Sequence, residues 1–361
     1  MFIIVCLVYL LVIVGLSVAV WRCFKAYWAK ILSLLLFLLV SNMFFLQRMV
    51  VDICPLWVSK VMYVIGTMWL VVVLYGAIVC ALLFLARLLA RLRKDTKFNP
   101  FSPILIGALV LLILGVGYMS AVSPRVVKYG VNSSYMEPND TLRFALVSDL
   151  HMGYAIGRDD IEELVSIINS QEVDFCIIAG DMVDGDLRPV LQDDLGAPLR
   201  DVKCPTYAVM GNHEYIGNAE EAYKYIQGLG VTILRDSEAI FGDSLVAIVG
   251  RDDVSVQHFE QRERKPLSEM VPGDMMSIVV DHQPMAIEES AEAGATLYLS
   301  GHTHAGQVWP MRMFTKSLFR CDYGMYGFEN TVGVVTSGYG TWGPRIRLGS
   351  NSEVVIVSVV R

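Results

Sequence analysis

The chain has 361 residues, of which 54% are hydrophobic, and a formal net charge of −7. This length accommodates a membrane region and one α/β domain, but leaves no room for a second large soluble domain. The first 128 residues hold 12 of the 29 Lys/Arg and only 2 of the 36 Asp/Glu, so an apolar, basic part precedes an acidic one. An acidic domain without a basic run argues against nucleic acid as the main partner, because phosphate-backbone binding depends on clustered Lys and Arg.

Four stretches near the N-terminus lack charged residues for about the length that crosses a bilayer, which is ~20 residues with a range of ~17–25. They are Met1–Val20, Ile31–Leu46, Val61–Leu85 and Pro103–Val122. The second is short, and Tyr27, Trp28 and Gln47 extend it into the interfaces. The first has no basic leader and no clear cleavage site, so we interpret it as a retained span rather than a signal peptide. We expect residues 1–122 to form a transmembrane region of four helices.

The orientation of these spans follows from the basic residues between them, because Lys and Arg favour the cytoplasmic side. Eight lie in the two loops that join spans one to two and three to four, and four lie on the opposite side. We therefore expect a multi-pass integral membrane protein whose C-terminal domain is on the non-cytoplasmic face. The run from Leu85 to Lys97 alternates apolar and basic residues; it is either an ordinary basic flank or a site for anionic headgroups.

The apolar signal stops after Val122. Pro124, Gly130 and Pro138 mark residues 123–139 as a linker, and residues 140–361 are expected to form the soluble domain. Within it Cys204 and Cys321 could pair only if the fold brings them together.

Apolar runs in the soluble domain alternate with amphipathic stretches, which predicts sheets covered by helices. The expected buried strands are Leu142–Ser148, Phe175–Ala179, Thr206–Met210, Leu245–Val249, Met276–Val280 and Thr296–Ser300, and the clearest helices are Ile161–Ser170 and Ala219–Leu229. Three further strands, Val332–Ser337, Arg345–Leu348 and Glu353–Val360, follow with only turns between them. We predict an α/β sandwich whose second sheet is closed by these C-terminal strands.

Five of the six histidines sit in turns that follow apolar runs, together with Asp and Asn. The turns are Ser148-Asp149-Leu150-His151, Gly180-Asp181-Met182-Val183-Asp184-Gly185, Gly211-Asn212-His213-Glu214, Asp281-His282 and Gly301-His302-Thr303-His304. The carboxyl edge of an α/β sheet is where ligands bind. Glycines 180, 211 and 301 would let the backbone turn sharply there.

Three Asp, five His and one Asn suit two divalent cations that share a bridging carboxylate. Imidazole and carboxylate ligands favour Mn, Fe or Zn, of which we expect Mn²⁺. A lone histidine at a strand end is more often structural or solvated, but that alternative would have to hold in all five turns. His258 lies outside the motifs and keeps the ordinary interpretation of a structural or solvated histidine.

This order of motifs resembles that of the calcineurin-like metallophosphoesterases over residues 143 to about 349. The resemblance implies an α/β/β/α sandwich and two metal ions. The first ion would be held by Asp149, His151, Asp181 and His304, and the second by Asp181, Asn212, His282 and His302, with Asp181 as the bridge. It also implies that His213 meets the leaving oxygen and that Asp184 orients it.

Two positions depart from the family pattern. Gly185 stands where protein phosphatases of the family carry Arg, which disfavours a phosphoprotein substrate. Ala305 stands where the membrane-associated phosphodiesterase branch, which the segment from Ser337 to Arg347 resembles, more often has Gly. Arg251, Arg345 and Arg347 are candidates for a second phosphate contact, with surface charge as the alternative for each.

We therefore expect a membrane-anchored hydrolase of a phosphomonoester or phosphodiester near membrane lipids, with a lipid-linked substrate as one option. The first alternative is a cytoplasmic-facing lipid pyrophosphatase of the UDP-diacylglucosamine type. The side of the membrane on which the domain lies distinguishes the two. A non-enzymatic metal-binding membrane sensor is the second. A transporter is disfavoured because none of the four spans contains an acidic or basic residue.

Overall fold

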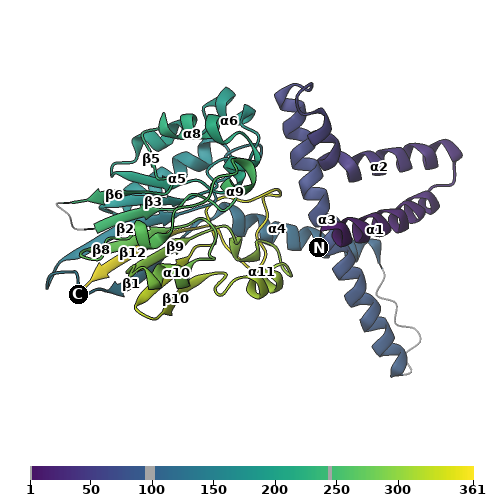
Figure 1. Cartoon of the computed structure of the whole chain (residues 1–361). Coiled ribbons are helices and arrows are strands. Elements are labelled where there is room, and N and C mark those ends of the chain that lie inside the picture. The colour runs from purple at the N-terminus through teal and green to yellow at the C-terminus, as the bar shows by residue number, and fades with distance from the viewer. Residues whose placement is uncertain (1, 94–101, 243–245) are drawn as a thin grey trace. The chain divides into compact units, whose positions relative to one another are not determined.

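The computed structural model of the chain describes residues 2–93, 102–242 and 246–361 (Figure 1). It divides into two compact units, one up to Val116 and one from Gly117 to Arg361. The boundary falls inside a helix, so the second unit includes the last six residues of the membrane region. Each unit is described by itself.

The first unit is helical. Its helices are α1 (Phe2–Cys23), α2 (Tyr27–Val50), α3 (Leu56–Leu92) and most of α4 (Pro103–Val122). Among the described residues α2, α3 and residues Ile104–Val122 are long and apolar enough to cross a bilayer. The span expected at Met1–Val20 stays a prediction, because Met1 lies outside the described residues and Tyr9–Cys23 alone is shorter than a span.

Helix α3 is longer than predicted. Its 37 residues correspond to about 55 Å of helix, whereas the hydrocarbon core is about 30 Å thick. It continues from the predicted end at Leu85 through Arg87 and Arg91, so the first half of the basic run is helical. Lys94 and Lys97 lie outside the described residues.

The second unit contains two six-stranded sheets. The first has the order β1 (Arg125–Asn132), β12 (Glu353–Val360), β2 (Thr141–Val147), β3 (Phe175–Ala179), β4 (Thr206–Val209) and β5 (Thr232–Ile233). The second has the order β10 (Gly324–Phe328), β11 (Thr331–Val335), β9 (Leu297–Ser300), β8 (Met276–Val280), β7 (Val246–Gly250) and β6 (Ser237–Phe241). Strands β2 to β5 are parallel to one another, and so are β7, β8, β9 and β11.

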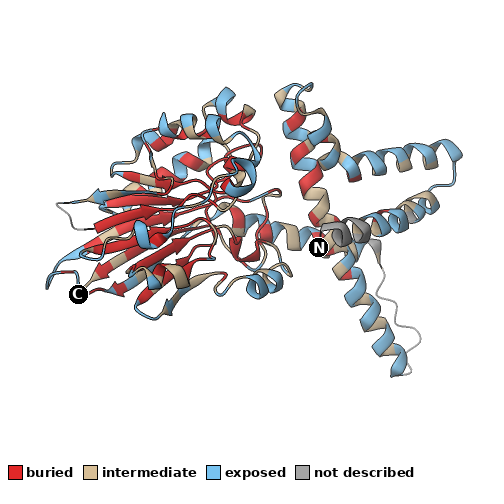
Figure 2. Cartoon of the chain, in the orientation of Figure 1, coloured by how far each residue is buried: buried red, intermediate tan, exposed pale blue. Residues whose placement is uncertain are grey.

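The two sheets pack face to face, and helices cover their outer faces. Successive residues of a strand point to opposite faces, so Phe144 and Leu146 of β2 face the second sheet while Ala145 and Val147 face the helices. Helices α5 (Arg158–Ser170) and α8 (Ala219–Gln227) cover the first sheet, and α10 (Ile287–Glu292) packs on the second. The central strands β2, β3, β7, β8, β9 and β12 are buried on both faces (Figure 2), which explains their unbroken apolar runs. The predicted α/β/β/α sandwich is confirmed.

Short elements fill the connections. They are α6 (Arg188–Asp193), α7 (Asn212–Ile216), α9 (Val256–Phe259), α11 (Arg312–Leu318) and the 3₁₀ turns η1 (Ala197–Asp201), η2 (Leu267–Glu269) and η3 (His304–Gly306).

Three predicted features differ from the structure. The expected linker 123–139 contains β1, which pairs in parallel with β12; its glycine and flanking prolines obscured the Val126, Val127, Val131 pattern. Strand β12 does not close the second sheet, because it inserts into the first between β1 and β2. Residues 345–348 do not form a strand; a single bridge joins Leu348 to Val308.

Candidate metal centre

The predicted site residues lie where five strands end. Strands β2, β3 and β4 of the first sheet and β8 and β9 of the second are each followed, within a few residues, by one of the polar turns. Since parallel strands end at the same edge of a sheet, the turns of both sheets converge. The structure brings together all nine candidate residues: Asp149, His151, Asp181, Asp184, Asn212, His213, His282, His302 and His304.

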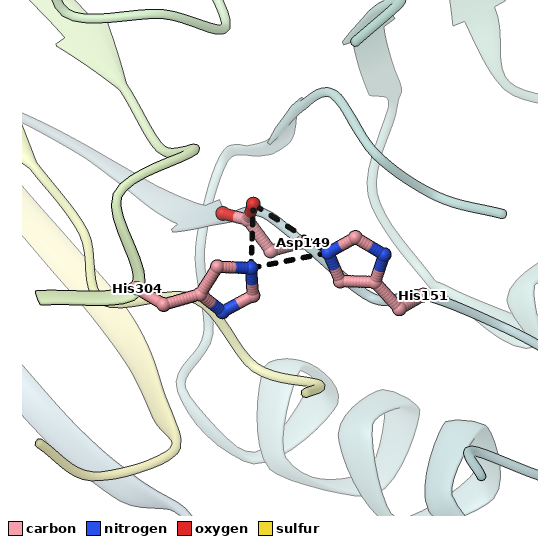
Figure 3. Close-up of side chains that lie close together, drawn as sticks. All are labelled: Asp149, His151 and His304. Carbon is pink, nitrogen blue, oxygen red and sulfur yellow. Dashed lines mark hydrogen bonds and ion pairs between the residues drawn. The ribbon is translucent and has the colours of Figure 1, made fainter. Parts of the chain in front are cut away.

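One group of donors consists of Asp149, His151 and His304 (Figure 3). The Nε2 atoms of the two imidazoles lie 3.1 Å apart, and both face Oδ1 of Asp149, at 3.9 Å from His151 and 3.4 Å from His304. The backbone N–H of His302 donates to the Asp149 carboxylate at 3.0 Å. All three side chains are almost completely buried, so the group is closed to bulk water on most sides.

A second group is built around Asp181 and contains His282 and His302. Nε2 of His282 lies 3.1 Å from Oδ2 of Asp181, 3.3 Å from Nδ1 of His302 and 3.2 Å from Oδ1 of Asn212. The same Oδ2 of Asp181 is 3.8 Å from Nε2 of His151, in the first group. Asp181 therefore stands between the two groups, where a bridging ligand would be.

The backbone of these turns is unusual. Asp149, His151, Asp181, His302 and His304 all have φ between 47° and 68°, in the left-handed region. A non-glycine residue there costs of order 1 kcal/mol or more, so packing must hold the conformation. Strained backbone conformations cluster at functional sites, and five of the nine candidate residues share this one.

Two of the three glycines expected in sharp turns have a different role. Gly180 has φ of +86°, as expected, but Gly211 is extended. A Cβ at Gly211 would lie 2.2 Å from Oδ1 of Asp181, and one at Gly301 would lie 1.9 Å from Oγ of Ser148. These glycines are required because neighbouring turns approach one another closely, not because the backbone turns at them.

The donor set fits divalent cations. Among the described residues, only histidines form ion pairs with Asp149 and Asp181, so both buried carboxylates lack a Lys or Arg counter-ion. Burial lowers the pKa of His302 to about 4, and burial lowers that of His304 to about 3, which keeps both imidazoles neutral at pH 7. Neutral imidazole is the form that binds a metal. The chain thus contains clusters able to hold metal ions.

His213 is placed differently from the other histidines. Its Nδ1 lies 3.1 Å from Oδ1 of Asp184, and its backbone N–H donates to Asp181 at 2.9 Å. Burial lowers the pKa of the imidazole, but the charge of Asp181 and the hydrogen bond to Asp184 outweigh it and raise the pKa to about 9. His213 is therefore protonated at neutral pH, the state of a proton donor.

Glu214 is a site residue that sequence reasoning missed. Its carboxylate is buried and accepts three backbone hydrogen bonds, from Asp181 at 3.1 Å, Val183 at 2.9 Å and Gly211 at 2.7 Å. It thereby ties the turn after β3 to the turn after β4. Burial and the charge of Asp181 raise its pKa to about 7, against the opposing effect of those hydrogen bonds. Its place in the Gly-Asn-His-Glu motif was the available signal.

The three candidate arginines are not simple surface charges. Arg251 is 4% exposed and pairs with Glu289 at 2.6 Å, and Arg345 bonds to Asp160 at 3.2 Å. Arg347 is fully buried and donates to the carbonyl oxygens of Gly338 and Gly340, with Nη2 3.4 Å from Nδ1 of His304. Only Arg347 thus adjoins a candidate ligand.

The remaining predictions concern residues outside the centre. His258 is exposed and contacts the ring of Phe259, so of the two ordinary interpretations it is the solvated one. Cys204 and Cys321 are both free thiols and do not pair.

Comparison with known proteins agrees with the motif order. Residues 142–306 match the family model described as calcineurin-like phosphoesterase. A Danio rerio protein called "Transmembrane protein with metallophosphoesterase domain" is 27% identical over 350 residues, which are 90% of this chain and 79% of that protein. An "Uncharacterized metallophosphoesterase" of Helicobacter pylori is 30% identical over 61% of this chain, and the match spans only 60% of the Helicobacter protein.

Among solved structures, a dimetal phosphatase from Danio rerio is similar, with a TM-score of 0.36, 13% identity and coverage of 54% of this chain and 86% of that one. The likeness to the zebrafish transmembrane protein includes the N-terminal helices as well as the α/β domain. Residues 142–306 of the chain are therefore similar to calcineurin-like phosphoesterases, and apolar helices precede this region.

Proposed function

We propose that the chain is a membrane-anchored hydrolase of a phosphomonoester or phosphodiester that works with two divalent metal ions. The observation that carries the proposal is the pair of donor groups joined at Asp181, in which imidazole nitrogens face one another at 3.1 and 3.3 Å. Nitrogens at such distances gain nothing from one another unless a proton or a cation lies between them.

The proposed ligands are those that the family resemblance implies. They are Asp149, His151, Asp181 and His304 for one ion and Asp181, Asn212, His282 and His302 for the other. A set of imidazole, carboxylate and amide oxygen without thiolate favours Mn²⁺, with Fe or Zn as alternatives. Bound ions of this kind supply Lewis acidity toward phosphoryl oxygens and toward the attacking water.

The proton for the leaving group is assigned to His213. Its hydrogen bond to Asp184 occupies Nδ1, which leaves Nε2 as the nitrogen able to meet a substrate oxygen. Asp184 is itself buried, and although burial raises its pKa, the adjacent imidazoles of His151 and His213 hold that pKa well below its ordinary value. A permanent carboxylate beside the imidazole keeps His213 charged and oriented. A positioned acid of this kind contributes ~10²–10⁴-fold to a rate.

The location of the reaction is the second part of the proposal. We propose a multi-pass membrane protein whose phosphoesterase domain is on the non-cytoplasmic face, supported by the eight-to-four distribution of basic residues in the loops. When a reporter that works only outside the cytoplasm is fused to the C-terminus, we expect reporter activity. Activity of a cytoplasm-specific reporter instead would favour the lipid pyrophosphatase alternative.

The test of the function is an assay of the full chain with phosphomonoesters, phosphodiesters and pyrophosphates in Mn²⁺, Fe²⁺, Zn²⁺ and Mg²⁺. The full chain is needed because a fragment that begins at Asp140 would lack β1 and leave one edge of β12 unpaired. Hydrolysis of a monoester or diester is expected, with none by the Asp181→Asn variant. A chain that binds metal yet hydrolyses no substrate of the three classes would be the metal-binding sensor instead.

A further inference from the structure

A group of exposed apolar side chains borders the metal centre in the second unit. Trp309 is 51% exposed, and in α11 Met313 is 68%, Phe314 44% and Leu318 68% exposed; Trp342, in another loop, is 49% exposed. Helix α11 buries none of its residues (Figure 2). We call these five side chains the apolar rim. All five lie beyond residues 142–306, which match the family model.

The apolar rim reaches the proposed proton donor through Trp342, and the residue after α11 contacts a proposed ligand. The ring of Trp342 lies 6.2 Å from that of His213, and Phe319, directly after α11, lies 5.9 Å from His302. Gln307 joins the loops that carry the two tryptophans, because its Nε2 donates to the carbonyl of Trp342 at 2.9 Å and its Oε1 accepts from the backbone of Trp342 at 3.0 Å. A molecule bound at the rim would therefore be next to the proposed proton donor.

The apolar rim is also connected to the end of a membrane helix. Residues 117–122 of α4 belong to the second unit. There the backbone N–H of Arg347 donates to the carbonyl of Gly117 at 2.9 Å, and a Cβ at Gly117 would meet Ile346 and Leu348. The same loop is hydrogen-bonded to the rim, because the N–H of Trp309 donates to the carbonyl of Leu348 at 2.7 Å.

The position of Gly117 shows how far from the end of α4 this contact lies. Gly117 lies five residues before the end of α4, which corresponds to about 7 Å along the helix. The loop that contains Leu348, the residue that pairs with Trp309, therefore contacts α4 before the C-terminal end of this helix. If α4 spans the bilayer, this contact lies at the depth of the headgroup region. Interfacial segments bury their apolar faces about 5–10 Å into that region.

The charges around the rim agree with a lipid surface. Helix α11 contains no acidic residue and carries the exposed Lys316. Two arginines flank it, and each is shared with a carboxylate: Arg312 with Asp322 at 3.3 Å and Arg320 with Glu288 at 2.7 Å. Basic residues beside a membrane are attracted by anionic headgroups. Tryptophans at such a boundary place an amphipathic ring at headgroup level. A protein partner would not explain why an apolar helix, flanking basic residues and a direct connection to α4 occur together, whereas a lipid surface does.

We propose that the apolar rim inserts into the headgroup layer of the bilayer that holds α4, so that the metal centre faces lipid-borne phosphate esters of the same membrane. The docking is inferred from the rim and its connection to α4 alone. The inference of a lipid-borne substrate also rests on the proposed phosphoesterase function. The rim would then select esters presented at the surface over those dissolved in water.

Docking is tested without any enzyme activity. The full chain carries photoreactive p-benzoyl-phenylalanine in place of Phe314, or in a control in place of Leu191, an exposed leucine of α6. After reconstitution into phosphatidylcholine vesicles with phosphatidylserine and illumination, mass spectrometry should find phospholipid adducts at position 314 and not at 191. Absence of adducts at 314, adducts with a second copy of the chain, or equal labelling at both positions would overturn the proposal.

The substrate part is tested by a double variant, Met313→Asp with Leu318→Asp. Hydrolysis of a phosphate ester displayed in vesicles should fall about tenfold or more, because two apolar side chains lose their burial, while hydrolysis of a water-soluble nitrophenyl ester should stay within about twofold. Leu191→Asp should change neither. An equal fall for both esters would mean that α11 only supports the site. If the unaltered chain hydrolyses neither ester, the proposed function fails, and the cross-linking result still decides the docking.

Discussion

Gly211→Ala is expected to inactivate the metal centre through a single methyl group. Gly211 has an extended backbone, so alanine is compatible with its φ and ψ. Any effect of the substitution must therefore come from steric overlap of the added methyl group. The added Cβ would lie 2.2 Å from Oδ1 and 2.6 Å from the backbone nitrogen of Asp181. The backbone atom cannot rotate away, and Glu214 holds it through a 3.1 Å hydrogen bond.

The magnitude follows from these distances. Carbon atoms in contact lie about 3.5–4.0 Å apart, so Asp181 or the turn after β4 must retreat by about 1 Å. A misplacement of about 1 Å in an active site can reduce the rate about 10²-fold. Overpacking of a buried position costs about 1–3 kcal/mol of stability. We expect kcat to fall about 10²-fold and the metal content to fall below that of the wild type, with a folded protein.

The assay compares kcat on a soluble nitrophenyl ester, metal content by elemental analysis and thermal stability. Gly273→Ala is the matched control, because nothing lies within 4 Å of a Cβ there, and it should change none of the three. A Gly211→Ala protein that keeps its full metal content and loses less than about threefold in kcat would refute the close approach of the two turns as the reason for this glycine.

Three further predictions concern the same centre. His213→Ala should keep its metals but lose far more rate on an alkyl ester than on a nitrophenyl ester, whose leaving group needs little protonation; equal losses, or loss of metal, would remove the acid role. Asp181→Asn should lose nearly all activity and metal at both positions, whereas His258→Ala should lose neither; full metal retention in the Asp181 variant, measured by elemental analysis, would contradict the bridge. In the metal-free protein, protonated His213 should stabilise the fold fully below its ordinary pKa of 6.5 and cease to do so as the pH rises through about 9. Urea unfolding of wild type and His213→Gln should therefore show a stability difference that shrinks between those pH values, and a difference that is constant with pH would contradict it.

The candidate site was predictable because its chemistry is local in sequence. Each of the five turns directly follows a run of buried residues, as Asp149 follows β2 and His282 follows β8. Runs buried on both faces are readily recognised as strands, and parallel strands bring their carboxyl ends together without further information. The structure places the candidate residues within contact of one another for this reason. Which ions they hold remains a proposal.

Features that depend on pairing between distant segments were not predictable. Strand β1 has mostly exposed or half-buried residues, so its sequence shows no apolar run, and its strand character depends on β12 more than 200 residues later. The role of Glu214 depends on backbone groups of the turn after β3, which a sequence does not place. Gly211 and Gly301 were recognised as special, but for the wrong reason, because close approach between turns is a property of the folded chain.

The position of β12 has a consequence for how the domain forms. Its eight residues lie between β1, which directly follows the last membrane helix, and β2, the first strand with a site turn. Until β12 is synthesised, both of these strands have an open edge, and the buried apolar cluster between the sheets lacks Val355 and Val357. The helices ahead of β1 leave the ribosome long before that. Assembly of the α/β domain must therefore wait for β12, and a chain that lacks β12 would have an unpaired, aggregation-prone sheet edge.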